Sequence, residues 1–201
     1  MVNIAVLVSG GGTNLQSLID NINNGYKHGQ IKLVISNKES AYGLERARIA
    51  NIPALFIKDE NLLIETLKEY KIDLIVLAGY LAIVSEKLIN LYKNKIINIH
   101  PSLIPSFAGP GCYGLRVHKM AYERGVKLSG ATVHFVTNEV DGGPIILQRA
   151  IDISNAKSPE EIQEMILLNI EHKILPEAVK LFCENKLKVN ERKVEIIWKE
   201  H

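Results

Sequence analysis

The chain has 201 residues, of which 47% are hydrophobic and 23% charged, and its 24 Lys and Arg against 22 Asp and Glu give a net charge of +2. This composition excludes a mainly disordered, collagen-like or coiled-coil protein. The small, evenly spread charge argues against a nucleic-acid or membrane surface, and the longest apolar stretch, residues 74–84, is shorter than the ~18 residues of a membrane span. Cys112 and Cys183 are too few for a disulfide framework, so we expect reduced thiols in a cytoplasmic protein.

Short apolar runs alternate with helical segments up to residue 100. Alternation of this kind indicates βαβ units and a parallel sheet covered by helices on both faces. The run 74–78 is the most apolar and is expected to lie centrally in the sheet. Strands are predicted at 2–8, 31–36, 54–57, 74–78 and 96–99, and helices at 13–24, 42–50, 60–70 and 85–92.

Beyond residue 100 the pattern changes to a loop rich in Gly and Pro, 105–114, and a short helix that ends near residue 124. Alternating runs at 131–136 and 145–153, separated by a turn at 138–143, predict a mixed or antiparallel extension of the sheet.

The C-terminal part begins with a strong helix start, in which Ser158 is the cap and Pro159 takes the first helical position. This helix is expected to run to about residue 184, with Pro176 as a candidate bend, and the tail 189–198 to form an edge strand. No linker interrupts the chain. We therefore predict a single α/β domain over residues 1–201, with an open, mostly parallel, twisted sheet, helices on both faces and a mixed C-terminal extension.

The segment SGGGTN, residues 9–14, joins the first strand to the first helix. Its glycines allow a ligand to approach the backbone, and the free N–H groups of the following helix start suit a phosphate. Leu15 replaces the third glycine of a dinucleotide fingerprint, and the Lys-Ser/Thr of a P-loop is missing. A tight turn without a ligand remains the alternative.

Asn98 and His100 lie two residues apart on a predicted strand that ends at Pro101, so both side chains point to one face at a carboxyl end. Together they could stabilise an oxyanion and move a proton. Asp141 follows the strand that contains His134, and a carboxylate near His100 would orient the ring and raise its pKa. The alternatives are a hydrogen-bonded structural histidine and an ordinary Asp-Gly turn.

Five segments in a specific order carry a family resemblance: SGGGTNLQSLID, SNKESAYGLERA, LAGYLAIV, NIHPSLIPSF and TVHFVTNEVDGGPIILQ. The chain resembles the phosphoribosylglycinamide formyltransferase family, the folate-dependent transformylases of purine biosynthesis, up to about residue 188. The resemblance implies a Rossmann-like formyltransferase fold. It also implies transfer of a formyl group from 10-formyltetrahydrofolate, as co-substrate, to the glycinamide amine of 5-phosphoribosylglycinamide.

The resemblance also assigns roles to residues. Asn98, His100 and Asp141 match the catalytic residues of the family. The substrate residues are Gly12, Thr13 and Asn14 for the phosphate and Glu171 for the ribose. The folate residues are Lys58, Leu81, Ala82, Ile83, Val84, Asn98, Thr137, Asn138, Glu139, Val140 and Asp141.

Three sites depart from the family pattern. In the family a basic residue often contacts the folate from the loop after the third strand, but this loop is short here and Lys58 is the candidate stand-in. Many family members carry Arg at the position of Ala82, and the loop 107–116 is richer in glycine than in many relatives.

The implied chemistry agrees with the residues. Attack of an amine on a formyl group creates a tetrahedral oxyanion, which donors from Asn98 and His100 would stabilise. No nucleophilic residue and no metal is needed, and Cys112 is not expected to act in catalysis. The expected partners are small molecules, with no nucleic acid and no membrane, and the chain is expected to be a monomer or weak homodimer.

Two other functions stay open. One is a related enzyme: a methionyl-tRNA or sugar-nucleotide formyltransferase, or a formyltetrahydrofolate hydrolase. The chain is not expected to carry the additional domains of the tRNA enzyme or the hydrolase. The other is a nucleotide-binding module without catalysis.

Overall fold

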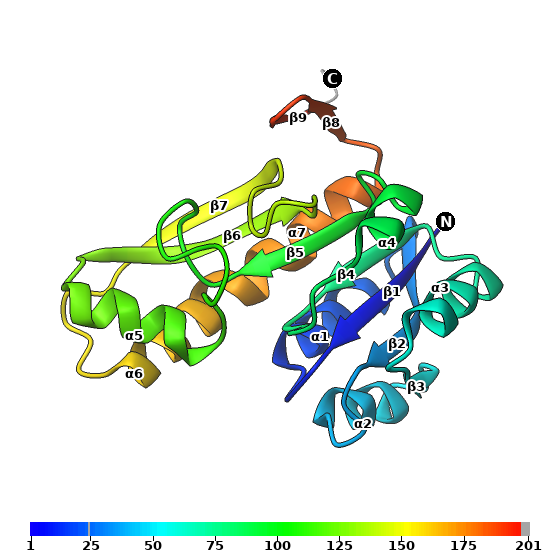
Figure 1. Ribbon diagram of the computed structural model, residues 1–201, viewed down its shortest axis with the longest axis horizontal. Helices are drawn as coiled ribbons and strands as arrows, with labels where there is room; N and C mark the ends of the chain where they lie inside the picture. The colour runs from blue at the N-terminus through cyan, green and yellow to red at the C-terminus, as the bar shows by residue number, and fades with distance from the viewer. Residues whose placement is uncertain (24, 198–201) are drawn as a thin grey trace.

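The computed structural model describes residues 1–23 and 25–197, which form a nine-stranded mixed sheet with helices on both faces (Figure 1). The strand order is β3-β2-β1-β4-β5-β6-β7-β9-β8. The strands are β1 Val2–Val8, β2 Gly29–Ser36, β3 Ala54–Phe56, β4 Leu74–Leu77, β5 Ile96–His100, β6 Leu128–Phe135, β7 Ile145–Asp152, β8 Leu187–Asn190 and β9 Lys193–Ile196. The α-helices and the two π-helical turns (η) are α1 Thr13–Leu18, η1 Ile19–Asn23, α2 Tyr42–Ile49, α3 Glu60–Glu69, α4 Glu86–Leu91, α5 Leu115–Arg124, α6 Pro159–Ile166, η2 Leu167–Glu171 and α7 His172–Cys183.

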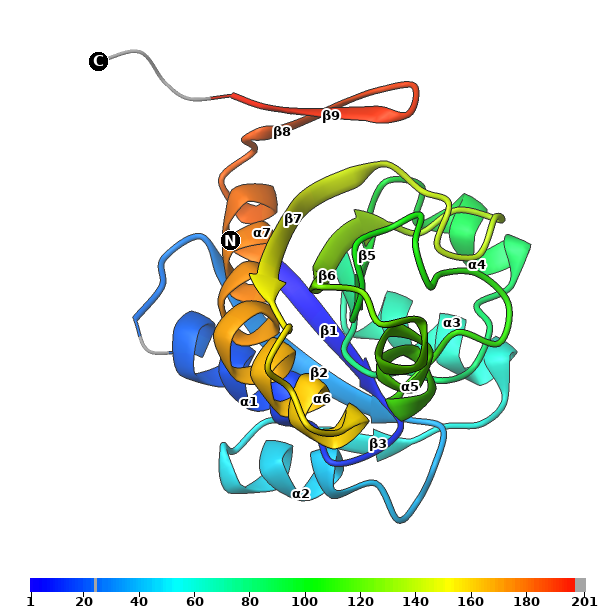
Figure 2. The same cartoon turned by 90° about the vertical axis from the view of Figure 1, so that its left-hand side faces the viewer.

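The strands from β3 to β5 run parallel, as predicted. Successive residues of β1 face opposite sides of the sheet, so that Ile4 and Val6 belong to one buried cluster and Ala5 and Leu7 to the other. Helices α1, α2, α6 and α7 contribute to the first cluster, and α3 and α4 to the second (Figure 2). Burial on both faces explains why residues 4–8 of β1 and all of β4 are continuous apolar runs.

The second half of the sheet is mixed, because β6 pairs antiparallel with both neighbours while β7 and β9 pair parallel, which confirms the mixed extension. Strand β6 pairs antiparallel with β5 on one side and β7 on the other. The register places His134 opposite Asn98 and Thr132 opposite His100. Polar side chains that are distant in the sequence thus become neighbours on two adjacent strands.

Two predicted helices contain π-helical turns. The helix predicted at 13–24 is α1 followed by η1, and residue 24 lies outside the described residues. The helix after Ser158 begins as predicted, with the Ser158 hydroxyl accepting from the Glu161 N–H and Pro159 in the first turn. Its irregular turn is η2, and Pro176 lies within α7. Such π-helical turns often mark functional positions, and η2 contains Glu171.

The C-terminal tail forms a hairpin where one edge strand was predicted. Strands β8 and β9 pair antiparallel, and Glu191 between them has φ +53°, a left-handed conformation that turns the chain. Ile145 of β7 pairs with Lys193, so the hairpin extends the main sheet. Residue 198, the predicted end of the strand, lies outside the described residues.

The parallel strands β1, β4 and β5 carry their carboxyl ends to one edge of the sheet, where ligands bind in open α/β folds. Among the described residues, no helix is long and apolar enough to cross a membrane.

Candidate active site

The glycine loop lies between β1 and α1 and packs tightly on α2. The Gly43 N–H donates to the Gly10 carbonyl at 3.0 Å. Gly12 has φ +70°, and a Cβ there would lie 2.7 Å from the Gly43 Cα. A side chain at Gly12 would therefore be strained and would push the loop away from α2. Thr13, the first residue of α1, is exposed.

Asn14 and Glu171 meet although they are 157 residues apart. The Asn14 side-chain amide donates to the Glu171 carboxylate at 2.6 Å, and both residues are buried. Burial raises the pKa of Glu171 to about 7, although the hydrogen bond from Asn14 opposes the shift. The other Asn14 side-chain atom, Oδ1, is buried and has no partner among the described residues. This pair joins the start of α1, directly after the glycine loop, to η2.

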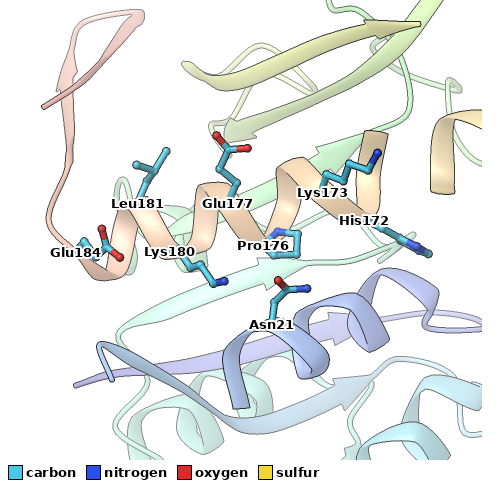
Figure 3. A pocket seen from close by; sticks show the side chains of 8 residues that line it. All are labelled: Asn21, His172, Lys173, Pro176, Glu177, Lys180, Leu181 and Glu184. Carbon is cyan, nitrogen blue, oxygen red and sulfur yellow. The ribbon is translucent and has the colours of Figure 1, made fainter. Parts of the chain in front are cut away.

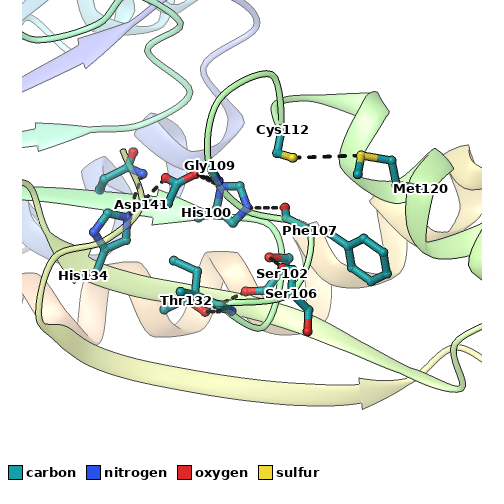
Figure 4. Close-up of polar contacts among 12 residues, drawn as sticks. His100, Ser102, Ser106, Phe107, Gly109, Cys112, Met120, Thr132, His134 and Asp141 are labelled. Carbon is teal, nitrogen blue, oxygen red and sulfur yellow. Dashed lines mark hydrogen bonds and ion pairs between the residues drawn. The ribbon is translucent and has the colours of Figure 1, made fainter. Parts of the chain in front are cut away.

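His100 and Asp141 come together at the carboxyl end of β5, as the sequence analysis expected (Figure 4). Asn98, two residues before His100 on the same strand, joins them through His134. His100 Nδ1 lies 3.5 Å from Asp141 Oδ2, which also accepts the Gly109 N–H at 2.9 Å. Asp141 has φ +55°, a left-handed conformation within the turn after β6. The three residues are thus held by β5, by this turn and by the loop after β5.

His134 is a fourth member of the cluster that the sequence analysis did not assign to the site. Its Nε2 lies 3.1 Å from Asn98 Nδ2 and 3.6 Å from Asp141 Oδ1, while its Nδ1 lies 2.9 Å from the Phe135 carbonyl. The sequence signal was a histidine within the otherwise apolar end of a strand. Its importance depends on the β5–β6 register, which the sequence alone does not reveal.

The pKa of His100 differs from the sequence expectation. Burial lowers the pKa of His100 below its usual value, and this outweighs the opposite effects of Asp141 and the Phe107 carbonyl. The expected rise from Asp141 is present, but desolvation of a side chain with only 4% exposure is larger. For Asp141, burial alone would raise the pKa, yet His134, His100 and the Gly109 N–H together lower it, so this carboxyl group stays ionised.

A hydrogen-bonded loop places the Phe107 carbonyl 2.9 Å from His100 Nε2. The Thr132 hydroxyl donates to the Ser102 carbonyl, and the Ser102 hydroxyl donates to the Ser106 carbonyl, both at 2.6 Å (Figure 4). The Gln148 amide donates to Thr132 Oγ1 at 2.9 Å. Strands β6 and β7 therefore fix the loop that faces His100.

The predicted folate segments lie near this cluster and leave apolar side chains exposed. The Leu81 N–H donates to the Ser9 hydroxyl at 2.9 Å, which joins segment 81–84 to the end of β1. Ile83 is 86% exposed and Leu81 50% exposed, which is unusual for such large apolar side chains. In the turn 137–140, Thr137 is half-buried and the next three residues are exposed.

The Lys58 side chain is exposed, and the structure gives it no hydrogen bond or ion pair with a described residue. The loop that carries it does adjoin segment 81–84, because Glu60 accepts the Ser85 N–H at 3.1 Å.

Two of the hollows on the surface bear on the location of the site. One, of about 740 Å³, lies beside Asp141 between the loop 104–110, the turn 139–143 and β9. The other, of about 530 Å³, follows α7 and includes Asn21 and His172 (Figure 3). Only the first contains predicted site residues.

Cys112 and Cys183 are both free of disulfides, as predicted. Cys112 faces Met120, with 4.0 Å between the sulfur atoms, and not the cluster around His100 (Figure 4). Within residues 1–23 and 25–197, no group of three or more His, Cys, Asp and Glu side chains is arranged to hold a metal ion.

Comparison with known proteins decides the family. The sequence profile of the formyl transferase family matches residues 2–179. The chain belongs to the formyl transferase family. This result confirms the family predicted from the sequence and, with it, formyl transfer as the reaction class.

Individual formyl transferases agree closely with the chain. It is 42% identical over 200 residues to phosphoribosylglycinamide formyltransferase of Haemophilus influenzae, covering 95% of this chain and 92% of the relative. It is 38% identical over 199 residues to the protein of the same name from Escherichia coli K12, covering 94% and 91%. The crystal structure of glycinamide ribonucleotide transformylase 1 from Symbiobacterium toebii superimposes with a TM-score of 0.91 at 43% identity, covering 98% of this chain and 94% of that one. The predicted Rossmann-like formyltransferase fold is confirmed.

Proposed function

We propose that this formyl transferase moves the formyl group of 10-formyltetrahydrofolate to the glycinamide amine of 5-phosphoribosylglycinamide, a step of purine biosynthesis. The observation that carries the proposal is the cluster of Asn98, His100 and Asp141 at the carboxyl end of β5. It lies at the same edge of the sheet as a glycine loop suited to a phosphate, which follows β1, and an exposed apolar segment suited to a folate ring system, which follows β4. The names of the relatives support the same substrate pair.

The proposed reaction is a direct transfer. The acceptor amine attacks the formyl carbon, a C–N bond forms, and the carbonyl oxygen becomes an oxyanion. The Asn98 amide and the His100 Nε2–H donate to this oxygen, and preorganised donors of this kind contribute about 10²–10³ each to the rate. The bond from the formyl carbon to N10 of the folate then breaks. The amine loses one proton and N10 of tetrahydrofolate gains one, with a water or His100 as the carrier.

Asp141 and His134 act as positioning residues in this scheme. The Asp141 carboxylate faces His100 Nδ1 at 3.5 Å, and the charge favours the imidazolium form as negative charge develops on the oxyanion. His134 lies between the Asn98 amide and Asp141, so it links the two sides of the cluster. His100 Nε2 now faces the Phe107 carbonyl, which must release it before His100 can donate to the oxyanion.

Substrate binding follows from the same geometry. Gly12, Thr13 and Asn14 hold the phosphate, and Glu171 accepts hydrogen bonds from the ribose hydroxyls. The pterin and its linker contact the segments 81–84 and 137–141. Lys58 provides a positive charge near the acidic end of the folate, a role that its exposed position allows. The proposed chemistry requires no metal ion.

An acceptor panel tests the function. The protein is incubated with 10-formyltetrahydrofolate and, in separate reactions, 5-phosphoribosylglycinamide, methionyl-tRNA, an amino-sugar nucleotide or no acceptor, while tetrahydrofolate formation is followed. We expect rapid formation only with 5-phosphoribosylglycinamide. Rapid formation without an acceptor would indicate a hydrolase, and preference for another acceptor would replace the proposed substrate.

We further propose that the protein acts as one domain, as a monomer or weak homodimer in the cytoplasm, without nucleic-acid or membrane partners. Pairing of β9 with β7 supports one domain, because the C-terminal hairpin joins the main sheet. Sedimentation at increasing protein concentration tests the oligomeric state.

A further inference from the structure

Arg46 of α2 lies against the carbonyl side of the glycine loop. Its Nε donates to the Gly11 carbonyl at 2.8 Å, and the Gly43 N–H donates to the neighbouring Gly10 carbonyl. Both donors belong to α2, so the carbonyl groups of Gly10 and Gly11 point toward this helix. Close packing of Gly12 on Gly43 leaves no room for a side chain between the loop and α2.

These carbonyl directions determine where the loop N–H groups point. In a trans peptide the N–H lies opposite the carbonyl of the same peptide unit, and the only cis bond in the described residues is Ile104–Pro105. The N–H groups of Gly11 and Gly12 therefore point away from α2. Neither donates to an acceptor within the described part of the chain, so both face the space next to Thr13 and Asn14.

The Arg46 guanidinium also brings a positive charge, which the Gln16 side chain links to the Asp20 carboxylate. Arg46 Nη1 donates to Gln16 Oε1 at 3.1 Å, and its Cζ lies 5.2 Å from the centre of the Tyr42 ring. Gln16 in turn donates from Nε2 to Asp20 Oδ1 at 3.0 Å, so Arg46, Gln16 and Asp20 form one chain of contacts. Burial and the Arg46 charge both lower the pKa of His172, the residue after Glu171, and outweigh the opposite effect of Asp20. The field of Arg46 thus reaches from the glycine loop to the Glu171 side of the same space.

We propose that Arg46 is a positioning residue for the acceptor phosphate: it holds the Gly11 carbonyl back so that the loop N–H groups face the phosphate, and its charge offsets that of the dianion. The inference rests on the proposed function, because it assumes a phosphorylated acceptor at this loop. It adds a side chain from a helix outside the β1–α1 segment to the predicted phosphate residues. A fixed guanidinium fork suits this task, because it bonds Gly11 and Gln16 at the same time.

The test compares Arg46→Gln and Arg46→Lys with the parent, using 5-phosphoribosylglycinamide and the same acceptor without its phosphate. We expect Arg46→Gln to raise the KM of the phosphorylated acceptor by about tenfold to a hundredfold, as for loss of a hydrogen bond to a charged group. The kcat and the folate KM should stay within about threefold. Arg46→Lys keeps the charge but loses the planar guanidinium group, so its KM for the phosphorylated acceptor should lie between those of the parent and of Arg46→Gln. With the dephosphorylated acceptor, the parent and Arg46→Gln should have equal kcat/KM.

Arg48→Gln is the matched control, because Arg48 lies on the same helix, is exposed and pairs only with Glu45 at 3.3 Å. It should behave as the parent in every assay. If Arg46→Gln lowers kcat/KM equally for both acceptors, Arg46 only supports the fold and the inference is wrong.

Binding of inorganic phosphate separates this inference from the proposed function. The melting temperature of the parent and of Arg48→Gln should rise with added phosphate, and that of Arg46→Gln should rise much less. A parent that binds phosphate but transfers no formyl group would contradict the proposed function and leave the Arg46 site supported. An equal phosphate response in Arg46→Gln would overturn the role of Arg46, even if the formyl transfer is confirmed. If Arg46→Gln does not fold, the same phosphate titration is read with Arg46→Lys: a smaller rise in melting temperature than in the parent supports the role of Arg46, and an equal rise overturns it.

Discussion

At the scale of single residues, the charge of Asp141 should control the protonation of His100. Burial lowers the pKa of His100 and Asp141 raises it, so Asp141→Asn, which keeps the size but removes the charge, should lower that pKa further. If the imidazolium is the active form, the descending limb of the pH–rate profile moves to lower pH. Activity at pH 7.5 should then fall by a larger factor than at pH 6.

The pH–rate profiles of Asp141→Asn, His100→Ala and the double variant check this coupling. The double variant should be about as slow as His100→Ala, because residues that act as a unit are not additive. If the pH–rate profile of Asp141→Asn is lower at every pH but neither limb moves, Asp141 only orients the His100 ring and does not control its protonation.

Glu171 should make the stability of the protein depend on pH. Its pKa is about 7 in the folded protein and near 4.5 when unfolded, so between these values the folded state keeps a proton that the unfolded state releases. Stability therefore falls as the pH rises through this window and levels off above it. Glu171→Gln removes this dependence and should be more stable than the parent above pH 8, by at most about 3 kcal/mol, with little difference near pH 4.5.

Urea unfolding of the parent and of Glu171→Gln from pH 4.5 to 8.5 measures the difference in their free energies of unfolding. The same variant should raise the acceptor KM, because Gln accepts fewer hydrogen bonds from hydroxyls than a carboxylate. A stability difference that does not change with pH would contradict the burial of an ionisable Glu171.

At the scale of elements, the contact between the glycine loop and α2 should be needed for acceptor binding but not for folate binding. Gly12→Ala places a Cβ against the Gly43 Cα in a left-handed conformation and should raise the acceptor KM at least tenfold. Gly125→Ala is the control, because Gly125 has φ +71° but open space around it. The control should lose about 1–2 kcal/mol of stability and keep its acceptor KM, as unfolding and steady-state assays would show. An unchanged acceptor KM in Gly12→Ala would remove the loop from the acceptor site.

The C-terminal hairpin should support the turn that carries Asp141. Arg192 in the β8–β9 turn donates to the Glu139 carboxylate at 3.1 Å and to the Gly142 carbonyl at 3.3 Å. Because the contact is exposed, Arg192→Ala should change stability by less than about 1 kcal/mol but raise the folate KM a few-fold. Lys188→Ala, which removes an exposed pair with Glu195 on the same hairpin, should change neither value. Equal folate KM values in both variants would show that the hairpin is independent of the site.

The elements differ in how far the sequence predicts them. The parallel strands and their helices follow from local patterns, since burial on both faces produces apolar runs such as β4. The place of His134 depends on which residue of β5 lies opposite it, and a one-residue change in register would turn its side chain to the other face. The hairpin β8–β9 depends on the left-handed Glu191, which no Gly marks in the sequence. The lowered pKa of His100 could not be predicted from the sequence either, because the burial that causes it depends on the three-dimensional packing.

At the scale of the whole molecule, the acceptor and folate sites are proposed to meet at the end of β5, with Glu171 and the glycine loop on one side and segments 81–84 and 137–141 on the other. The most direct measurement follows a carbon-13 label in the formyl group of 10-formyltetrahydrofolate during reaction with 5-phosphoribosylglycinamide, with NMR detection. The account predicts that the label appears on the acceptor amine in step with tetrahydrofolate formation, and that Asn98→Ala and His100→Ala slow both by the same large factor. Label recovered as formate, or full transfer in the absence of His100 and Asn98 side chains, would contradict it.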